Sequence, residues 1–520
     1  MISHVPMGIN ERWFFCFRPW REDLNKAGWF NSGRFRLAAL VVLAMAVRVF
    51  YLLRNENMPG YAVKNVLQVL SIIDQPGFKQ NFNGICSMLY IYLLVPFVYV
   101  WRDPVWVPKL VTLIFGVFLL LPYYGTIRVL FNPWVAFFSC CILVFYPLHI
   151  VQSSMTTSDA VYYFFIFSSF YYFFSYVTQK VQLSALYLSV LFLNIAALLR
   201  FESWVFIPFF FLILWGKEKK LAAYFLVLSM IAPLTWLFLN QMLSGFLFYT
   251  FFYSAQTSFA EIVAKSVPYD PGFWSWLAVL WRSSGPVLLI TGVLGVLLAL
   301  WLRQKLLLAV FFMVAFLSLS INSYLARMWH NERYSIFLGL ILIPYAVFFV
   351  YKIAEISSVR RKYLFLMFLG LPLMNFVQIA YSPVSSMWCM NSVSTDDIKD
   401  LAGWLKMHLS AGKSIILDSD PYAVYSQSIL LKSGVSVGRC AFVDAMFFKK
   451  GFFANQKSFG MYLLSARPTL LILNSKGPLQ KVLNFDLSKK MVVFSGVMFD
   501  RVFDKNLGGH GEYVVYRVSF

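Results

Sequence analysis

The chain has 520 residues, of which 60% are hydrophobic, 19% aromatic and only 13% charged, and this composition excludes an ordinary soluble globular protein. Its formal net charge of +21 falls mostly in short joints between apolar runs, where basic residues orient membrane helices and contact lipid headgroups, so we expect no nucleic-acid partner. Six cysteines without a Cys-x-x-Cys pair predict neither a metal knuckle nor a disulfide framework.

Long apolar runs separated by short polar joints fill most of the chain. A bilayer core takes about 20 apolar residues per helix, and fewer where a helix is short or packed obliquely. The runs that are nearly free of charge cover residues 35–53, 107–127, 133–151, 160–178, 182–199, 204–215, 221–240, 285–302, 306–322, 334–351 and 363–382. We therefore predict a polytopic α-helical membrane protein with about 11 transmembrane helices.

The basic residues predict which side of the membrane each joint occupies. The segment 1–34 is rich in arginine and lysine, and no small-residue cleavage site follows the first run, which therefore indicates an uncleaved anchor. The joints 217–220, 303–305 and 352–362 are also basic, and we expect all four segments on the cytoplasmic side. This orientation fits a multi-pass protein of a bacterial inner membrane with a cytoplasmic N-terminus and a periplasmic tail. An endoplasmic reticulum membrane obeys the same charge rule and is the alternative, although the sequence shows no retrieval signal.

The segment 54–106, between the first two runs, is too long to be a simple connector. Apolar residues at helical spacing over 63–70 predict an amphipathic helix in it. The stretch 86–101 is short and contains Pro96, and a full span there would move 54–85 to the cytoplasmic side. We therefore interpret it as a helix at the membrane face within a large outer loop.

From residue 394 to residue 520 the composition changes to that of a soluble α/β domain. Thr395 is a good N-cap for a helix. The apolar segments 413–418, 468–474 and 513–518 are typical of strands. We expect this periplasmic domain to cover the outer mouth of the membrane part or to bind an acceptor, and a folded cap without a site of its own is the alternative.

Charges near the ends of the apolar runs are candidates for function. A charge at membrane depth costs about 2.5–3.5 kcal/mol on insertion scales, so each one needs a partner or a role. Arg200 and Glu202 form one cluster. A second cluster consists of Arg327, His330, Glu332, Arg333 and Tyr334. Arginines on the outer face run against the positive-inside rule, and arginine binds phosphate bidentately. The clusters therefore predict either a phosphate site or local ion pairs.

Two acids and a histidine lie at similar depth. Asp159 stands just before an aromatic run, where an acid either stabilises a helix N-terminus or takes a proton. Glu56 follows the first run at the right depth for a base. His149, after Pro147, is either a substrate ligand or a packed interfacial histidine. Arg48, in the last third of the first run, either snorkels outward or has a function.

In this order, these residues resemble the GT-C superfamily of polyprenyl-phosphate-dependent glycosyltransferases, which includes protein O-mannosyltransferases and the aminoarabinose transferase of lipid A. The resemblance covers most of the chain and implies a transmembrane glycosyltransferase domain over 35–383. It rests first on Arg48 before a large outer loop, on Tyr124-x-x-x-Arg128-x-Leu-Phe131, and on the Pro147 joint that reaches Asp159. The next motif, Arg200-Phe-Glu202-Ser-Trp204, is similar to the Arg-Tyr-Glu-Gly motif of bacterial members. Arg333-Tyr334 ahead of Pro344 and the α/β tail complete the order.

The resemblance implies an inverting glycosyltransferase that moves a sugar from a polyprenyl-phosphate donor to a glycan, lipid or protein acceptor on the periplasmic face. A divalent metal is compatible with this chemistry, but no residue is assigned to it. The implied site residues are Glu56 or Asp159 for the acceptor's proton, Arg200, Arg327 and Arg333 for the phosphate, Glu202 to orient Arg200, and Tyr334 and His149 beside the substrate.

The chain departs from the family pattern in its first outer loop. The family places an Asp early there, often as Asp-Asp or Asp-Glu, whereas residues 58–65 read Met-Pro-Gly-Tyr-Ala-Val-Lys-Asn, with no acid between Glu56 and Asp74. Either Glu56 or Asp159 takes that role, or the chain is an inactive relative that acts as an accessory subunit. A transporter of a lipid-linked glycan is a further alternative, although the sequence lacks repeated halves.

Overall fold

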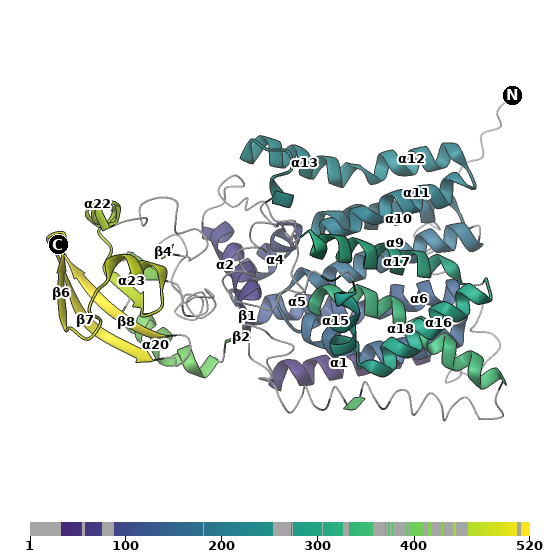
Figure 1. Ribbon diagram of the computed structural model, residues 1–520, viewed down its shortest axis with the longest axis horizontal. Helices are drawn as coiled ribbons and strands as arrows, with labels where there is room; N and C mark the ends of the chain where they lie inside the picture. Colours follow the sequence, from purple (N-terminus) through teal and green to yellow (C-terminus); the bar gives the residue numbers. More distant parts are fainter. Residues whose placement is uncertain are drawn as a thin grey trace.

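A helical bundle lies at one end of the molecule and a β-sheet with flanking helices lies at the other (Figure 1). The structure, a computed structural model, describes residues 33–54, 58–74, 88–179, 181–252, 272, 274–303, 305–325, 332–356, 370, 373–374, 377, 392–393, 395–408, 414–418, 429, 440–443, 456–506 and 511–520.

The bundle is built from the apolar runs. Each run up to residue 351 is one helix or two consecutive helices, because an α-helix satisfies its own backbone hydrogen bonds where no water is present. The run 363–382 lies mostly outside the described residues. The helices are α1 (Gly33–Arg54), α2 (Gly60–Asp74), α4 (Met88–Trp101), α5 (Trp106–Phe118), α6 (Leu120–Leu130), α7 (Pro133–Val144), α8 (Pro147–Ser153), α9 (Ser158–Gln179), α10 (Leu183–Leu199), the 3₁₀ helix η4 (Phe201–Val205), α11 (Phe206–Trp215), α12 (Lys219–Ser229), α13 (Ile231–Ser244), α15 (Ser275–Ser284), α16 (Pro286–Trp301), α17 (Leu306–Tyr324) and α18 (Glu332–Ile356).

The described residues contain six segments that are long and apolar enough to cross a membrane, or seven if the bent pair α7 and α8 counts as one span. Four further apolar helices, among them α4 and α10, are shorter than 18 residues. The polytopic α-helical membrane class is therefore confirmed, whereas the total of about 11 spans stays a prediction. The six segments are Phe35–Arg54, Trp106–Leu130, Ser158–Gln179, Lys219–Ser244, Leu306–Tyr324 and Glu332–Ile356.

The break between α7 and α8 has a local cause. Pro147 is the first residue of α8 and has no N–H to continue the hydrogen-bond ladder of α7, which ends at Val144. The two helices are bent by 63° relative to each other. This bend gives the short helix α8 its own direction and places it beside α5 and α1.

The centre of the bundle is packed with phenylalanine. Phe167, Phe170 and Phe173 of α9 are fully buried, and the Phe173 ring stacks on Phe210 of α11 with centroids 4.0 Å apart. Stacked and edge-to-face aromatic pairs each add about 0.5–1.5 kcal/mol beyond area burial. Because α9 packs against α5, α6 and α10, it is the central helix of the bundle, and its first turn is held in a fixed position.

The second part of the molecule is a six-stranded sheet with the order β4-β3-β5-β8-β7-β6. Strands β4, β3 and β5 are parallel, and the other neighbours are antiparallel. Three of its strands were predicted from the sequence (β3, β5 and β8), and so was the helix that begins at Thr395. The elements are β3 (Ile415–Asp418), β4 (Cys440–Val443), β5 (Leu470–Asn474), β6 (Met491–Phe494), β7 (Val497–Asn506) and β8 (Glu512–Ser519), with α20 (Thr395–His408), α22 (Gln456–Ala466) and α23 (Pro478–Leu483).

The central strands of the sheet are buried on both faces. Leu417 and Ile472 pack with Leu401 of α20, whereas Leu471 and Leu473 pack with Leu463 of α22 on the other face. Such strands read as continuous apolar runs, which explains why β3 and β5 were recognisable in the sequence.

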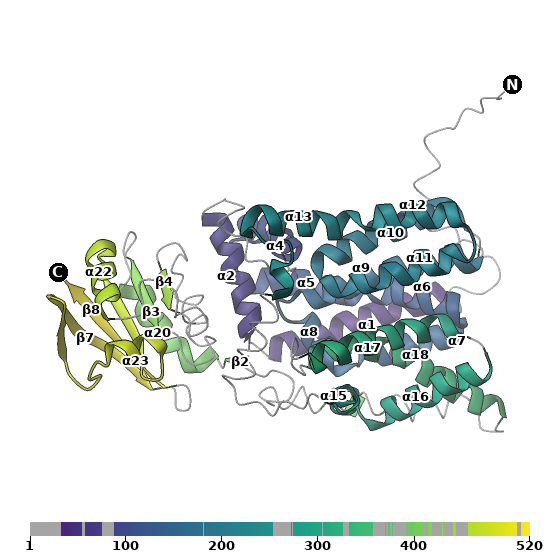
Figure 2. The same cartoon turned by 45° about the horizontal axis from the view of Figure 1, so that its top comes forward.

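A short two-stranded sheet joins the two parts of the molecule. β1 (Met58–Pro59) pairs antiparallel with β2 (Ser392–Val393), which precedes α20. Helix α2 follows β1 and stands between the bundle and the six-stranded sheet (Figure 2). Leu67 of α2 packs against the core that contains Leu401 and Ile415, so α2 touches the tail as well as α4.

Candidate active site at the start of α9

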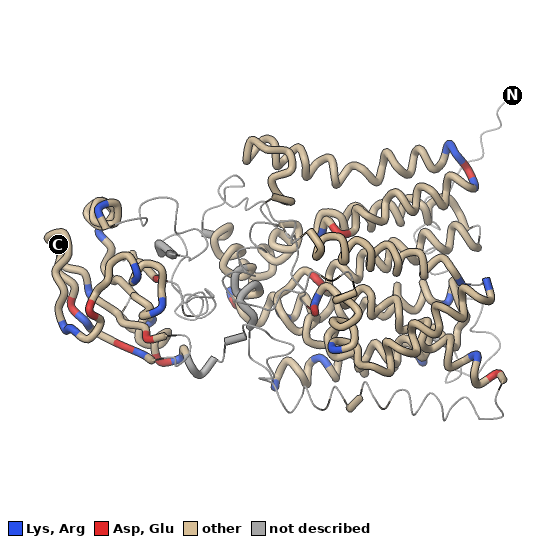
Figure 3. The backbone as a smooth tube through the Cα atoms, viewed as in Figure 1, with Lys and Arg blue, Asp and Glu red and all other residues tan. Residues whose placement is uncertain are grey.

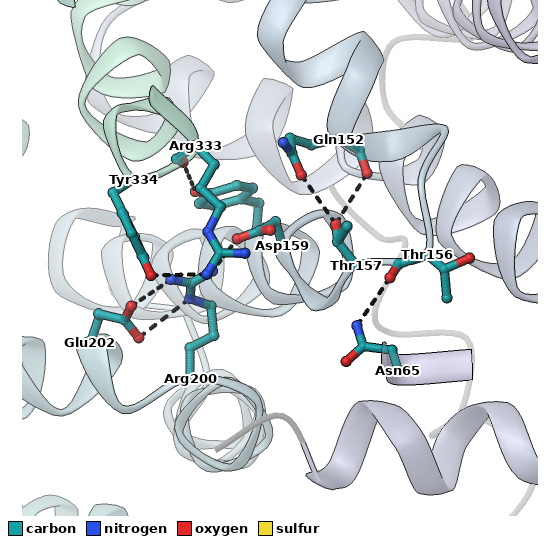
Figure 4. A network of polar contacts seen from close by, with 10 residues as sticks. Asn65, Gln152, Thr156, Thr157, Asp159, Arg200, Glu202, Arg333 and Tyr334 are labelled. Carbon is teal, nitrogen blue, oxygen red and sulfur yellow. Dashed lines mark hydrogen bonds and ion pairs between the residues drawn. The ribbon is translucent and has the colours of Figure 1, made fainter. Parts of the chain in front are cut away.

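Three elements bring charged residues together at the start of α9. Because α9 and α10 are consecutive helices packed side by side, the start of α9 with Asp159 meets the end of α10, where Arg200 and Glu202 follow. The first turn of α18 adds Arg333 and Tyr334 (Figure 4). The structure therefore unites residues that the sequence placed in two separate clusters.

Arg200 is the centre of this group, because its guanidinium pairs with both acids. Its Nη1 pairs with Oδ1 of Asp159, and its Nη2 lies 2.5 Å from Oε1 of Glu202. Its Nε also donates to Oε2 of Glu202 over 3.3 Å, so the contact with Glu202 is bidentate. The exposed side-chain fractions are 11% for Arg200, 25% for Glu202 and 1% for Asp159. Asp159 is therefore the least accessible of the three.

Tyrosine rings surround the two arginines. The Cζ of Arg200 lies 5.7 Å from the Tyr162 ring centroid and 5.2 Å from that of Tyr334, within range of a cation–π contact. The Cζ of Arg333 lies 4.8 Å from the Tyr334 ring, and its Nη2 donates to the Tyr334 hydroxyl over 2.9 Å. The Tyr163 hydroxyl donates to the backbone carbonyl of Arg333. Sequence reasoning missed Tyr162 and Tyr163, although they follow Asp159 by about one helical turn.

Neutral polar residues lie on the other side of Asp159 (Figure 4). The Thr157 hydroxyl donates to the backbone and side-chain oxygens of Gln152, both over 3.3 Å. The Nδ2 of Asn65 in α2 donates to the carbonyl of Thr156 over 3.0 Å. Sequence reasoning also missed Asn65. The sequence feature that could have indicated Asn65 is its polar side chain next to the apolar positions of α2. The hydrogen bond from Asn65 to Thr156 brings the first loop to the joint that carries Asp159.

His149 and Arg48 form a separate polar group inside the bundle. The Nη2 of Arg48 lies 2.7 Å from Nδ1 of His149, and the Nε donates to Oγ of Ser153 over 3.0 Å. Arg48 also donates to the carbonyls of Ala44 and Val144. Both Arg48 and His149 are fully buried, so the snorkelling interpretation of Arg48 is wrong. Its four acceptors stabilise the guanidinium at the break between α7 and α8.

Two candidate residues lie outside the described residues, namely Glu56 and Arg327. Over the described ranges, no group of three or more His, Cys, Asp and Glu side chains is arranged to hold a metal ion. Asp159 and Glu202 are the acids of the described site, and both contact Arg200.

Comparisons with known proteins agree with this architecture. Residues 85–238 match the family model of dolichyl-phosphate-mannose-protein mannosyltransferases, and this segment contains Asp159, Arg200 and Glu202. No curated protein matches the chain. The matched segment runs from just before α4 into α13, so it includes the central helix of the bundle.

Solved structures extend the likeness to nearly the whole chain. ArnT from Cupriavidus metallidurans in the apo state aligns with a TM-score of 0.58 at 10% identity, over 92% of this chain and 98% of that one. ArnT bound to undecaprenyl phosphate aligns with a TM-score of 0.57 at 11% identity, over 92% and 97%. The Archaeoglobus fulgidus oligosaccharyltransferase in the apo form gives 0.57 at 11% identity, over 86% and 70%. At such identities the likeness shows a shared fold.

The chain therefore shares the fold of these membrane glycosyltransferases, and its residues 85–238 match a mannosyltransferase family model. Both findings support the resemblance to the GT-C superfamily that the sequence motifs predicted.

Proposed function

We propose that the chain is an inverting glycosyltransferase that moves a sugar from a polyprenyl-phosphate donor to an acceptor on the periplasmic face of a bacterial inner membrane. The observation that carries the proposal is the meeting of two arginines and a buried carboxylate at one end of the bundle. In this organisation 1–34 is a cytoplasmic arm, 35–383 is the membrane domain and 394–520 is periplasmic. Structural neighbours that contain undecaprenyl phosphate or dolichol-phosphate support the donor class.

The proposed chemistry is a single displacement. An acceptor hydroxyl oxygen attacks the anomeric carbon, the bond from that carbon to the phosphate oxygen breaks, and the polyprenyl phosphate leaves with the electron pair. Asp159 accepts the proton of the hydroxyl as the general base. Arg200 and Arg333 stabilise the negative charge of the departing phosphate, where preorganised charge contributes most.

The test is transfer of labelled sugar from a polyprenyl-phosphate donor by purified protein in lipid nanodiscs, with a panel of glycan, lipid and peptide acceptors. We expect Asp159→Asn to lower the turnover number by about 10²–10⁴-fold, because a general base contributes that much. Arg333→Ala should also lower turnover, while Asp103→Asn should not. Asp103 lies just before α5 and accepts from the backbone N–H groups of Val105 and Trp106, and the side-chain oxygen of asparagine can accept the same hydrogen bonds.

Other results would replace parts of the proposal. Full activity of Asp159→Asn together with loss of activity in Glu56→Gln would make Glu56 the base. Absence of product with any acceptor, from protein that still binds the labelled lipid, would favour the inactive accessory subunit. Movement of the lipid across the membrane without a glycosylated product would favour the transporter.

A further inference from the structure

The four charged residues of the site that Figure 4 labels compensate one another before any substrate is bound. Arg200 and Arg333 supply two positive charges, and Asp159 and Glu202 supply two negative ones. A donor phosphate adds negative charge to this balanced group. It therefore has to compete with the carboxylates for the guanidinium groups, because an anion binds a cation less strongly when another anion already neutralises it.

Carboxylates already use three of the five N–H groups of the Arg200 guanidinium. Glu202 accepts from Nε and Nη2 along one edge, and Asp159 accepts from Nη1. The rings of Tyr162 and Tyr334 lie within 6 Å of its Cζ. A guanidinium binds phosphate through two parallel N–H groups of one edge. Because Glu202 holds the Nε–Nη2 edge, a phosphate that binds Arg200 in this way uses an edge that includes Nη1, where it competes with Asp159.

The two carboxylates are not equivalent. Glu202 makes two contacts with Arg200 and lies two residues away in the same segment, so the chain itself keeps it close. Asp159 makes one contact and belongs to another helix, 41 residues away in sequence. Asp159 is therefore the carboxylate that a phosphate displaces more easily.

We propose that the donor phosphate replaces Asp159 on Arg200, so that donor binding itself releases the carboxylate that takes the acceptor's proton. This inference rests on the proposed function and adds an order of binding to it. The donor binds first, and Asp159 then becomes available to the acceptor hydroxyl. After transfer, Asp159 releases the proton to water, the polyprenyl phosphate leaves, and the Arg200–Asp159 ion pair forms again. A polyprenol without phosphate does not displace Asp159.

The first test measures equilibrium binding of labelled undecaprenyl phosphate, without a sugar, to the full-length protein in nanodiscs. Asp159→Asn removes the competing anion, and we expect it to bind the lipid phosphate more tightly, by about 5–150-fold, the usual range for coupled sites. Asp103→Asn should leave the affinity unchanged, because Asp103 accepts from the backbone N–H groups of Val105 and Trp106, and asparagine can accept the same hydrogen bonds.

The matched control is Glu202→Gln, which removes one negative charge from the same arginine. If the total charge alone set the affinity, both variants would bind undecaprenyl phosphate more tightly. We expect tighter binding only for Asp159→Asn, because Glu202 holds Arg200 in position while Asp159 competes for it. Equal tightening in both variants, or unchanged or weaker binding by folded Asp159→Asn, would overturn the proposal.

A second measurement uses the wild-type protein and does not depend on the folding of any variant. In an ordered reaction with the donor first, undecaprenyl phosphate is released last, so it should inhibit competitively against the donor and noncompetitively against the acceptor. If the acceptor binds equally well to the donor-free protein, the proposed order of binding, with the donor first, is wrong. Wild-type protein that neither binds undecaprenyl phosphate nor transfers sugar would instead refute the proposed function itself.

Discussion

At the scale of single residues, Arg48 shows how a charge is accommodated inside a membrane bundle. Its guanidinium is fully buried and donates to side-chain and backbone acceptors on α1, α7 and α8. No carboxylate is among its partners in the described part of the chain. The carbonyl of Val144 at the helix break is one of the acceptors, so Arg48 satisfies a backbone group that the interrupted ladder of α7 leaves open.

Replacing Arg48 by methionine should therefore lower stability. The change leaves buried acceptors on His149, Ser153 and Val144 without a donor, at about 1–3 kcal/mol for each group. Thermal unfolding in detergent measures the effect as a lower midpoint temperature. Arg54→Met is the control on the same helix, because Arg54 is exposed and surface changes usually stay within about 0.5 kcal/mol. Equal midpoints for Arg48→Met and wild type would contradict this account.

At the scale of whole elements, the approach of α16 to α18 depends on small residues. A Cβ atom at Gly295 would lie 2.0 Å from the backbone carbonyl oxygen of Tyr345, and one at Gly292 would lie 3.1 Å from the Leu342 side chain. Without a hydrophobic driving force between helices in lipid, close backbone packing through small residues holds such pairs together. Gly295 therefore sets the distance between these two helices.

Gly295→Ala should separate α16 from α18 and lower the midpoint of thermal unfolding, because a backbone atom cannot move aside as a flexible side chain can. Overpacking of this kind costs about 1–3 kcal/mol. Gly216→Ala is the matched control, since the nearest atoms to a Cβ there are 3.8 Å away. A similar midpoint for both variants would show that the helix pair can adjust without loss of packing.

At the scale of the whole molecule, the sheet and the basic joints lie at opposite ends of the bundle. Figure 3 shows few charged residues along the bundle and basic residues at its end farthest from the sheet. Basic joints are expected on the cytoplasmic side, which would place the sheet in the periplasm. The pairing of β1 with β2 and the contact of Leu67 with the tail core then link the tail to α2, whose Asn65 touches the candidate site.

This orientation can be measured with single cysteines and a membrane-impermeant maleimide on intact spheroplasts. Met461→Cys in the tail, where the side chain is 56% exposed, should be labelled. Glu218→Cys, in the exposed basic joint between α11 and α12, should be labelled only after the membrane is opened. Peptide mass spectrometry separates these sites from the native cysteines. The reverse pattern would invert the orientation and place the candidate site on the cytoplasmic side.

Elements were predictable from the sequence to the extent that their signal was local. In lipid, an apolar run satisfies its backbone hydrogen bonds by forming a helix. Composition alone was therefore enough to predict α1, α9, α17 and α18. The doubly buried strands β3 and β5 were recognisable for a similar reason. Strands β6 and β7 were missed, because many of their residues are partly exposed and buried and exposed positions alternate only weakly. Their pairing with β8 and with each other is what defines them as strands.

The sequence by itself determined the membrane class, the resemblance to the GT-C superfamily and most of the charged residues of the candidate site, because each depends on composition or on short motifs. Only the tertiary structure decided which charges meet. Asp159 and Arg200 are 41 residues apart and Arg48 and His149 are 101 apart, and helix packing alone brings each pair into contact. The same packing buried Arg48, brought Asn65 to the joint before α9, and surrounded Arg200 with two carboxylates and two tyrosines. No local pattern specifies such contacts, since they depend on the positions of helices far apart in the chain.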